Sequence, residues 1–585
     1  MTIAILAVLA GVALGLFSRR VSSWLEPIYA FGVVAALVVV VGHLLPEAAE
    51  ALGIQALLVF GVGVLVPSIV ERLAARPDGS GHPPMQVGFM ALLVHQAGDG
   101  AALAAAAHAG AGVEVGLAVA AHTVPLVTLM TTLMARELGV RRALVRAGAM
   151  ALATLAGAGS LAIVPEATFA LVEPYAAALI AGVLVHVVLH APPAAATRAL
   201  GGRFLELLAI AAGVALALVG SAHESTLAST LSATLLRIAL AVAPALLGGL
   251  LLASAVQAMG ARLPATWMRT GPRLLQALRG AVVGVPLPVC TCGVLPTARA
   301  LLERGAPPAL LVAFVVAAPL LGLDTFLVTA RFIDVPTALL RVGFAVVVAM
   351  AAALVASRRK RRAAGGGMVI RAFARAPQRL AERSPATKPE RNDAARGFFA
   401  RALLHFDELV FHVVPWAAAG ILVAAYVDVL LPANAIDHRV LDVVIVTLAS
   451  VPLYLSASAV TPVAAVLLLK GLSPGAALAG LVVGPATDLA TIGFLKRSFG
   501  GRATGFALLG LVGGALLLAF AVNATGLSIV PQLSADDGWL SRLSLATLVV
   551  LVVRSIWQSG VVAWAEALSR TPSLEWRVSR AYARL

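Results

Sequence analysis

The segment VPLPVCTCGVLP, residues 285–296, holds both cysteines of this 585-residue chain among residues that break helices. Its three prolines lack the backbone N–H that a helix needs, and Gly293 lowers the helix propensity further. The sequence on either side is strongly apolar. The pattern predicts two apolar arms separated by a non-helical turn, with Cys290 and Cys292 at its tip.

The composition indicates that this turn lies in a membrane protein. Sixty per cent of the residues are hydrophobic and 12% are charged, whereas about a quarter of the residues of soluble domains are charged. Apolar runs recur along almost the whole chain, and a helix of about 20 apolar residues spans a bilayer. We predict an all-α polytopic membrane protein with about fifteen transmembrane helices. The lipid bilayer is its first partner, and a bacterial-type inner (plasma) membrane is the expected location.

The turn belongs to a segment that occurs twice. When the sequence is shifted by 166 residues, 285–325 aligns with 451–491 without a gap, and 15 of the 41 positions are identical. Basic residues in 261–280 and after residue 357 predict that both regions are cytoplasmic. Three apolar segments lie between them, so one segment has to turn back without crossing. We therefore predict inverted repeats, each with a re-entrant hairpin.

Charge and repeat divide the chain into five parts. Between residues 358 and 401 there are 13 Lys and Arg residues and three acidic residues, which predicts a cytoplasmic loop. No nucleic-acid-binding motif accompanies this charge, so we expect no nucleic-acid partner. The predicted parts are an eight-helix membrane domain at 1–222, the first repeat at 230–356, the basic loop at 357–403, the second repeat at 404–570 and a basic cytoplasmic tail at 571–585.

The two cysteines predict a site for a soft ligand. Thiolates bind thiophilic partners such as monovalent copper, zinc, mercury and trivalent arsenic. An extended backbone, which the prolines favour, lets both thiols of C-x-C face one ligand. The predicted substrate-binding residues come from the turn and from its second copy: Pro288, Cys290, Thr291, Cys292, Gly293, Pro296, Ser456, Ser458 and Thr461. In the alternatives, the cysteines are packing residues or a redox pair, and the hydroxyls hydrogen-bond their own broken backbone.

The stretch PLPVCTCGVLPTARALLERGAPPALLVAFVVAAP resembles the signature of the ArsP-like predicted permeases, and the resemblance extends over about residues 230–570. It implies a polytopic efflux permease, with trivalent organoarsenicals as substrates of the best-understood members. It also implies that Cys290 and Cys292 hold the metalloid. Only the first repeat offers thiols, because Ser456 and Ser458 stand at the same places in the second.

Two acidic residues are candidates for energy coupling. The chain has no GxxxxGK[ST] phosphate-binding loop, so we expect no ATP hydrolysis and predict that the chain is not an enzyme. Asp324 and Asp488 lie at near-equivalent places in the two repeats, within apolar segments. Carboxylates inside a membrane are costly and usually functional, which favours proton coupling. Capping of a broken helix is the alternative role.

Residues 1–222 carry a second polar pattern. His95 and Asp99 are one helical turn apart, and His122 lies on the next predicted span. Imidazole and carboxylate groups are typical ligands of transition metals. These stretches resemble the ZIP metal transporters, which implies a divalent-metal site, such as zinc, at these three residues. Leu126 stands where that family has an acidic residue, so a degenerate domain with buried core histidines is the alternative.

The residues and the resemblances together predict a membrane permease, in particular a secondary efflux transporter for a thiophilic metal, metalloid or organometalloid. Two alternatives stay open. In the first, the N-terminal domain transports a divalent metal such as zinc. In the second, the cysteine pair cycles between dithiol and disulfide in a membrane thiol oxidoreductase, although C-x-C closes a strained ring. The sequence predicts no resident cofactor beyond that divalent metal.

Overall fold

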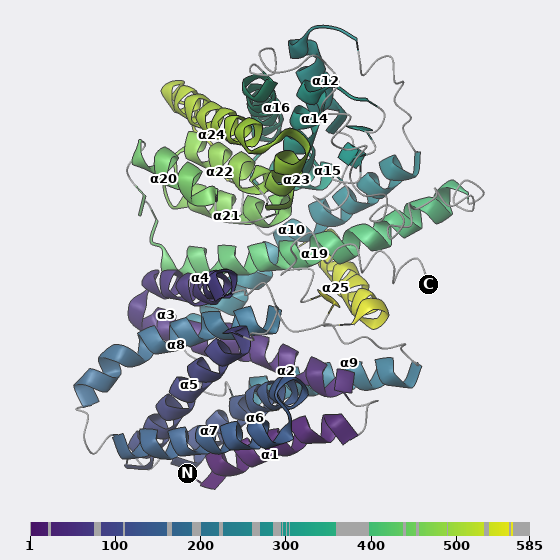
Figure 1. Cartoon of the computed structure of the whole chain (residues 1–585). Coiled ribbons are helices and arrows are strands. Elements are labelled where there is room, and N and C mark those ends of the chain that lie inside the picture. Colours follow the sequence, from purple (N-terminus) through teal and green to yellow (C-terminus); the bar gives the residue numbers. More distant parts are fainter. Residues whose placement is uncertain are drawn as a thin grey trace. The chain divides into compact units, whose positions relative to one another are not determined.

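The chain folds into helices (Figure 1). All regular structure in the described residues is helical, and none of it is strand. The all-α class predicted from composition is therefore confirmed. The computed structural model describes residues 2–20, 25–74, 83–108, 112–160, 166–189, 200–220, 226–259, 270–284, 294, 297–299, 301–302, 305–357, 397–433, 435–436, 440–451, 456–487, 489–531, 538–560 and 563–564.

Many of these helices are long and apolar enough to cross a bilayer. By length and composition, seven single helices qualify, and two bent helix pairs raise the number to nine if each pair is one span. Shorter apolar helices accompany them, such as Leu441–Ser450 and Ala457–Leu469. The chain is an integral membrane protein. The number of about fifteen spans stays a prediction, because these helices are counted only over the described residues.

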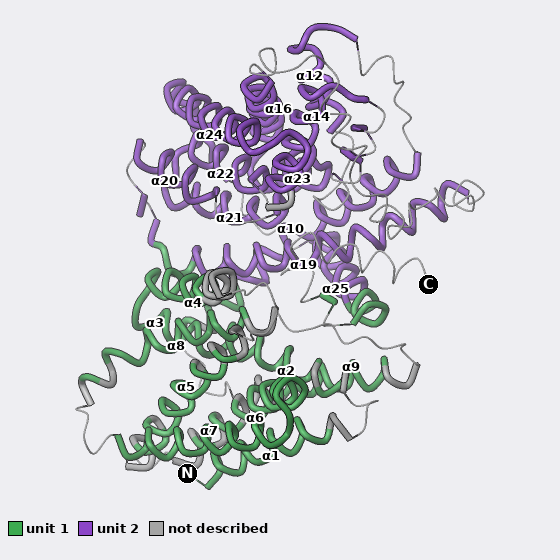
Figure 2. The backbone as a smooth tube through the Cα atoms, in the orientation of Figure 1, with its two compact units in different colours: residues 1–233, 429–431, 553–569 green, residues 234–428, 432–552, 570–585 purple. Residues whose placement is uncertain are grey.

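The chain forms two compact units (Figure 2). Unit 1 comprises residues 1–233, 429–431 and 553–569, and unit 2 comprises residues 234–428, 432–552 and 570–585. The division of the sequence into five parts, which rests on charge and membrane side, stays a prediction.

Helices of unit 1 pack in pairs through small residues. They are α1 (Thr2–Arg20), α2 (Leu25–Val39), which continues through a π-helical turn (Val40–Leu44) into α3 (Leu45–Leu52), α4 (Gln55–Ala74), α5 (Pro83–His108), α6 (Gly112–Glu137), α7 (Val140–Ser160), α8 (Glu166–Leu189) and α9 (Leu200–Gly220). The packed pairs are α1 with α6, α2 with α9, α4 with α8 and α5 with α7. A Cβ atom on Gly157 of α7 would lie 1.8 Å from the carbonyl oxygen of Ala97 of α5. Only glycine permits this backbone contact, which is typical of membrane helices.

The remaining helices lie mostly in unit 2. They are α10 (Thr226–Met259), α12 (Arg273–Gly284), α14 (Pro308–Ala317) with a 3₁₀ end η3 (Ala318–Leu320), α15 (Leu323–Phe332), α16 (Val335–Ser357), α19 (Phe398–Leu430), α20 (Leu441–Ser450), α21 (Ala457–Leu469), α22 (Pro474–Ala486), α23 (Leu489–Phe499), α24 (Gly501–Ala524) and α25 (Trp539–Ser559).

Helix bounds in unit 2 reproduce the sequence repeat. The starts of α14, α15 and α16 are residues 308, 323 and 335, and those of α22, α23 and α24 are 474, 489 and 501, each 166 residues later. Pro308 and Pro474 both occupy the first helical turn, where a missing N–H is harmless. Packing repeats as well, because α14 lies between α12 and α16, and α22 lies between α20 and α24. The repeats meet where α16 packs along α24 and α15 against α21.

Each repeat also contains one bent helix pair. The helix through α14 and η3 meets α15 at 46°, and α22 meets residues Thr491–Phe499 of α23 at 61°. Pro319 and Pro485 stand just before these bends. They favour the bends because proline interrupts the hydrogen bonds of a helix. The opposite orientation of the repeats and their re-entrant hairpins stay predictions, since residues 285–293 lie outside the described part of the chain.

Candidate functional site

The predicted cysteine turn lies outside the described residues. This holds for Pro288, Cys290, Thr291, Cys292, Gly293 and Pro296, and also for Asp488 of the second repeat. The described residues on both sides belong to the interior of unit 2. A Cβ atom on Gly284, the last residue of α12, would lie 2.9 Å from Cα of Ala318, and Val294 is fully buried. The substrate-binding and coupling roles of these residues stay predictions.

The second copy of the turn is described and begins helix α21. Ser456 caps the helix, because its Oγ accepts a hydrogen bond from the backbone N–H of Ala459 at 3.3 Å. The hydroxyl oxygens of Ser456 and Ser458 are 2.9 Å apart. Thr461 Oγ1 donates to the carbonyl oxygen of Ala457 at 2.8 Å. Ser456 and Thr461 therefore bond to the backbone of their own helix, and Thr461 has a further partner; whether the three hydroxyls line a substrate cavity stays a prediction.

That partner is Arg341, which sequence reasoning missed. Arg341 lies on α16, one of the long apolar helices, and its side chain is only 2% exposed. Its Nη1 donates to Thr329 Oγ1 at 2.6 Å and to Thr461 Oγ1 at 3.0 Å. The second bond joins the first repeat to the second across 120 residues. A lone arginine inside an apolar helix is a signal that the sequence does offer, because such residues are costly and usually functional.

Asp324 lies beside this arginine, in the first turn of α15. Its carboxylate accepts the backbone N–H of Thr325, and its charge interacts with that of Arg341. Helix α10 fixes its position, since a Cβ atom on Gly249 would lie 2.5 Å from Cα of Asp324. Gly322 is the N-cap of α15, and no side chain caps this helix; the capping and coupling roles of Asp324 both stay predictions. Arg341, Thr329, Thr461 and Asp324 are called the central cluster below.

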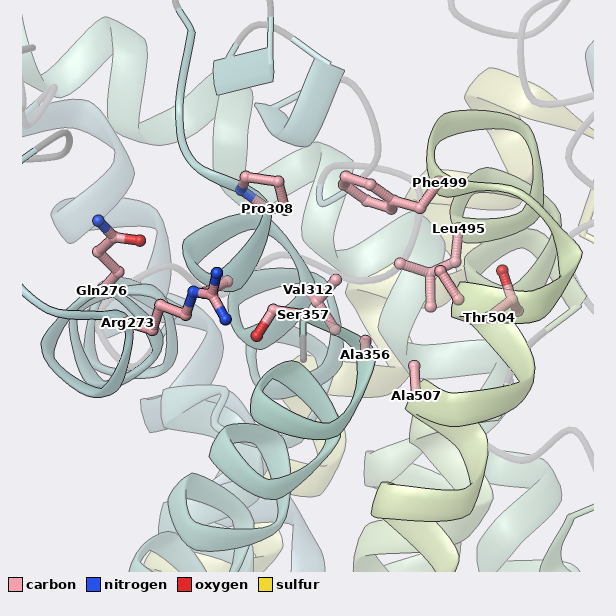
Figure 3. Close-up of a pocket in the computed structure, with 12 residues that line it drawn as sticks. Arg273, Gln276, Pro308, Val312, Ala356, Ser357, Leu495, Phe499, Thr504 and Ala507 are labelled. Carbon is pink, nitrogen blue, oxygen red and sulfur yellow. The ribbon is translucent and has the colours of Figure 1, made fainter. Parts of the chain in front are cut away.

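A pocket of about 120 Å³ lies between the two repeats, lined by α12, α14 and α16 of the first and by α23 and α24 of the second (Figure 3). Arg273 and Gln276 of α12 line one side and Leu495, Phe499 and Thr504 the other, with Ser357 at the end of α16 between them. Leu495 and Ala507, both lining residues, follow Thr329 and Arg341 by 166 positions. On the side of the second repeat, the pocket is therefore lined by the counterparts of Thr329 and Arg341 of the central cluster.

The matching end of the second repeat is tied by hydrogen bonds. The backbone N–H of Ser473 donates to Asp442 Oδ2 at 2.8 Å, and Asn523 Nδ2 donates to Ser473 Oγ at 2.9 Å. Asn523 Oδ1 also accepts the backbone N–H of Gly475 at 2.8 Å. We call this network the tied end. The residues 166 positions before Asp442 and Asn523 are Gln276 and Ser357, which line the pocket, so the two repeats differ at equivalent places.

Unit 1 contains part of its predicted metal site. His95 Nε2 lies 3.6 Å from Asp99 Oδ2, and both side chains are buried. Gln96 Nε2 lies 3.4 Å from the same carboxylate and 3.4 Å from Thr123 Oγ1 of α6. The side chain of His122 lies outside the described residues. Within the described residues no three His, Cys, Asp or Glu side chains form a metal-binding group, and the metal site and the ZIP resemblance stay predictions.

Comparison with known proteins finds one family. A family model described as a predicted permease, ArsP_1, matches residues 227–562, more than half of the chain. The match includes the cysteine turn, the first repeat, the second repeat as far as residue 562 and the central cluster. No curated protein and no solved structure matches.

Proposed function

The chain belongs to the ArsP_1 family of predicted permeases, and on this basis we propose a secondary transporter that exports a thiophilic metalloid, such as a trivalent organoarsenical, across a bacterial-type inner membrane. The hydrogen bond between Arg341 of the first repeat and Thr461 of the second carries the proposal. A charged side chain buried in an apolar membrane unit usually marks the path of a substrate. Many transporters place that path where two repeats meet.

The repeat links the cysteines to this centre. Cys290 and Cys292 align with Ser456 and Ser458, which stand at the start of the helix that carries Thr461. We expect the thiols to capture the soft atom and the hydroxyls of the second copy to complete the cavity. Each thiol that bonds to an arsenic(III) hydroxide releases one water molecule, so capture consumes neither ATP nor an oxidant. Capture favours higher pH, because the thiolate is the reacting form.

The pocket supports entry from the cytoplasm. Ser357 ends α16, and the basic segment 358–401 follows it directly, a charge that the positive-inside rule assigns to the cytoplasm. The tied end belongs to the other repeat. In the proposed cycle the substrate enters at the pocket and leaves after the repeats have rocked, so that the tied end opens.

The test is uptake into everted membrane vesicles. Trivalent methylarsenic, inorganic arsenite and zinc are offered to wild type and to the Cys290→Ser/Cys292→Ser variant. We expect accumulation of an arsenical that the serine variant loses. A thiol-blocking maleimide is the matched control, since it should stop the wild type and leave the residual rate of the serine variant unchanged. Equal arsenical uptake by both proteins would contradict a thiol site.

A second candidate function rests on the buried contact between His95 and Asp99. It is a divalent-metal site in unit 1, which binds or moves zinc. Alanine at both positions should then abolish zinc uptake and leave arsenical export intact. If zinc alone moves and the serine variant equals wild type, the function belongs to unit 1. A thiol oxidoreductase would instead form a disulfide during turnover under mild oxidant, which mass spectrometry of the vesicles detects.

A further inference from the structure

Arg341 presents donors that no described residue accepts. Its Nη1 is bonded to Thr329 and Thr461, but Nε and Nη2 are buried with no hydrogen-bond partner in the described part of the chain. A guanidinium is charged at every physiological pH, and a buried charged donor without an acceptor is strongly destabilising. Within the described residues, the central cluster therefore lacks an acceptor for these two nitrogens.

The two free donors lie on the same edge of the guanidinium. Nε–H and Nη2–H point in parallel directions in this planar group, and the edge matches two oxygens that share one central atom. The rest of the cluster is satisfied. The hydroxyls of Thr329 and Thr461 donate to the carbonyl oxygens of Thr325 and Ala457 while they accept from Nη1. The hydroxyls thus hold the guanidinium in place with its free edge unoccupied by described residues.

Asp324 does not take this edge. Its charge interacts with Arg341, but its carboxylate accepts the backbone N–H of Thr325, and no ion pair joins the two side chains in the structure as described. A fixed positive charge repels metal cations and attracts negative or strongly polarised oxygens, more strongly in a low dielectric than in water. The free edge of Arg341 thus favours oxygens over a bare cation.

We propose that the Nε–H and Nη2–H edge of Arg341 binds a group with two oxygens on one atom, such as the oxyacid form of trivalent arsenic or a carboxylate. The cargo then meets the central cluster while both of its oxygens are still attached, before the thiols replace them, and not as a bare metal cation. This inference rests on the proposed function and specifies the chemistry of its substrate.

The experiment replaces the two-donor edge and keeps the charge. Arg341→Lys has a single charged nitrogen in place of the planar fork. Arg331→Lys, at a half-buried arginine of α15, is the matched control. Initial uptake of trivalent methylarsenic into everted vesicles is measured against its concentration, with acetate, inorganic phosphate and zinc as competitors. The melting temperature of the purified full chain is measured with arsenite, acetate or phosphate, each alone.

We expect Arg341→Lys to raise the half-saturating concentration by about 10-fold or more, while Arg331→Lys equals wild type. At least one two-oxygen probe should raise the melting temperature of wild type, and none should raise that of Arg341→Lys. Competition by acetate or phosphate would show that the edge takes any such anion. If neither anion competes but arsenite raises the melting temperature, the edge binds the arsenic species and not other two-oxygen anions.

The inference and the proposed function fail separately. If wild type takes up the arsenical and Arg341→Lys has the same half-saturating concentration, the inference alone is overturned. The inference alone is also overturned if zinc competes with uptake and neither acetate nor phosphate does. Absence of wild-type uptake overturns the proposed substrate, and the melting temperatures then decide the Arg341 site. Arg341→Met gives the same readouts if the lysine variant does not fold, because an apolar residue of similar length is tolerated where a buried charge was.

Discussion

A methyl group at Gly249 should displace the helix that carries Asp324. A Cβ atom there would lie 2.5 Å from Cα of Asp324, whereas carbon atoms in contact are about 3.5–4.0 Å apart. Gly249→Ala therefore forces α10 and α15 apart by about 1 Å, at a cost of about 1–3 kcal/mol for an overpacked contact. Because α15 also carries Thr329, a shift of this size would stretch its 2.6 Å bond to Arg341 to about the 3.5 Å limit of a hydrogen bond.

The neighbouring residue supplies the matched control. A Cβ atom on Gly248 meets nothing within 4 Å, and alanine favours the helix over glycine by up to about 1 kcal/mol. We expect Gly249→Ala to lower the melting temperature in detergent and to slow arsenical uptake, and Gly248→Ala to change neither or to raise the melting temperature. Equal melting temperatures of the two variants would refute the close contact between α10 and Asp324.

Three further changes test the second repeat. Gly420→Ala of α19 should slow uptake, because its Cβ would lie 2.2 Å from the carbonyl oxygen of Ala459 and push α21, with Thr461, away from Arg341; uptake equal to wild type would contradict this. Asn523→Ala removes two bonds of the tied end and should cost about 1–3 kcal/mol, measured by thermal unfolding; an unchanged melting temperature would exclude the network. Asp428→Asn weakens the ion pair with Lys470, whose Nζ lies 2.9 Å from the carboxylate, and should lower the melting temperature most at low salt. A loss of melting temperature that is the same at high salt would argue against an ionic contact.

The sequence predicts much of the helical framework of unit 2. Its repeat requires equivalent helices, and α14 and α22 do begin at the paired prolines Pro308 and Pro474. The bends follow from Pro319 and Pro485, whose effect on a helix is local and needs no knowledge of tertiary contacts. Where the residues act locally, pattern and structure agree.

The central cluster depends on contacts that a local pattern does not contain. Averaged hydropathy hides one charge among the apolar residues of α16, so the hydropathy pattern alone does not single out Arg341. Its bond to Thr461 arises from the packing of the two repeats, across 120 residues. The repeat pattern does predict Thr461, and its bond to its own backbone is present; its role in lining a substrate cavity stays a prediction. For Asp324, both roles suit a carboxylate at a helix start, and the sequence does not choose between them.

In the proposed cycle, the difference between the tied end and the pocket gives the empty protein a preferred state. Opening the tied end breaks three hydrogen bonds around Asp442, Ser473 and Asn523, each worth about 0.5–1.5 kcal/mol. A bias of a few kcal/mol leaves the opposite state at about 0.1–10% of the molecules. A cargo can reverse that bias only by binding the rarer state more tightly. In the proposed cycle, the empty protein therefore rests with the pocket end open towards the cytoplasm, and binding of the cargo sets the rate of turnover.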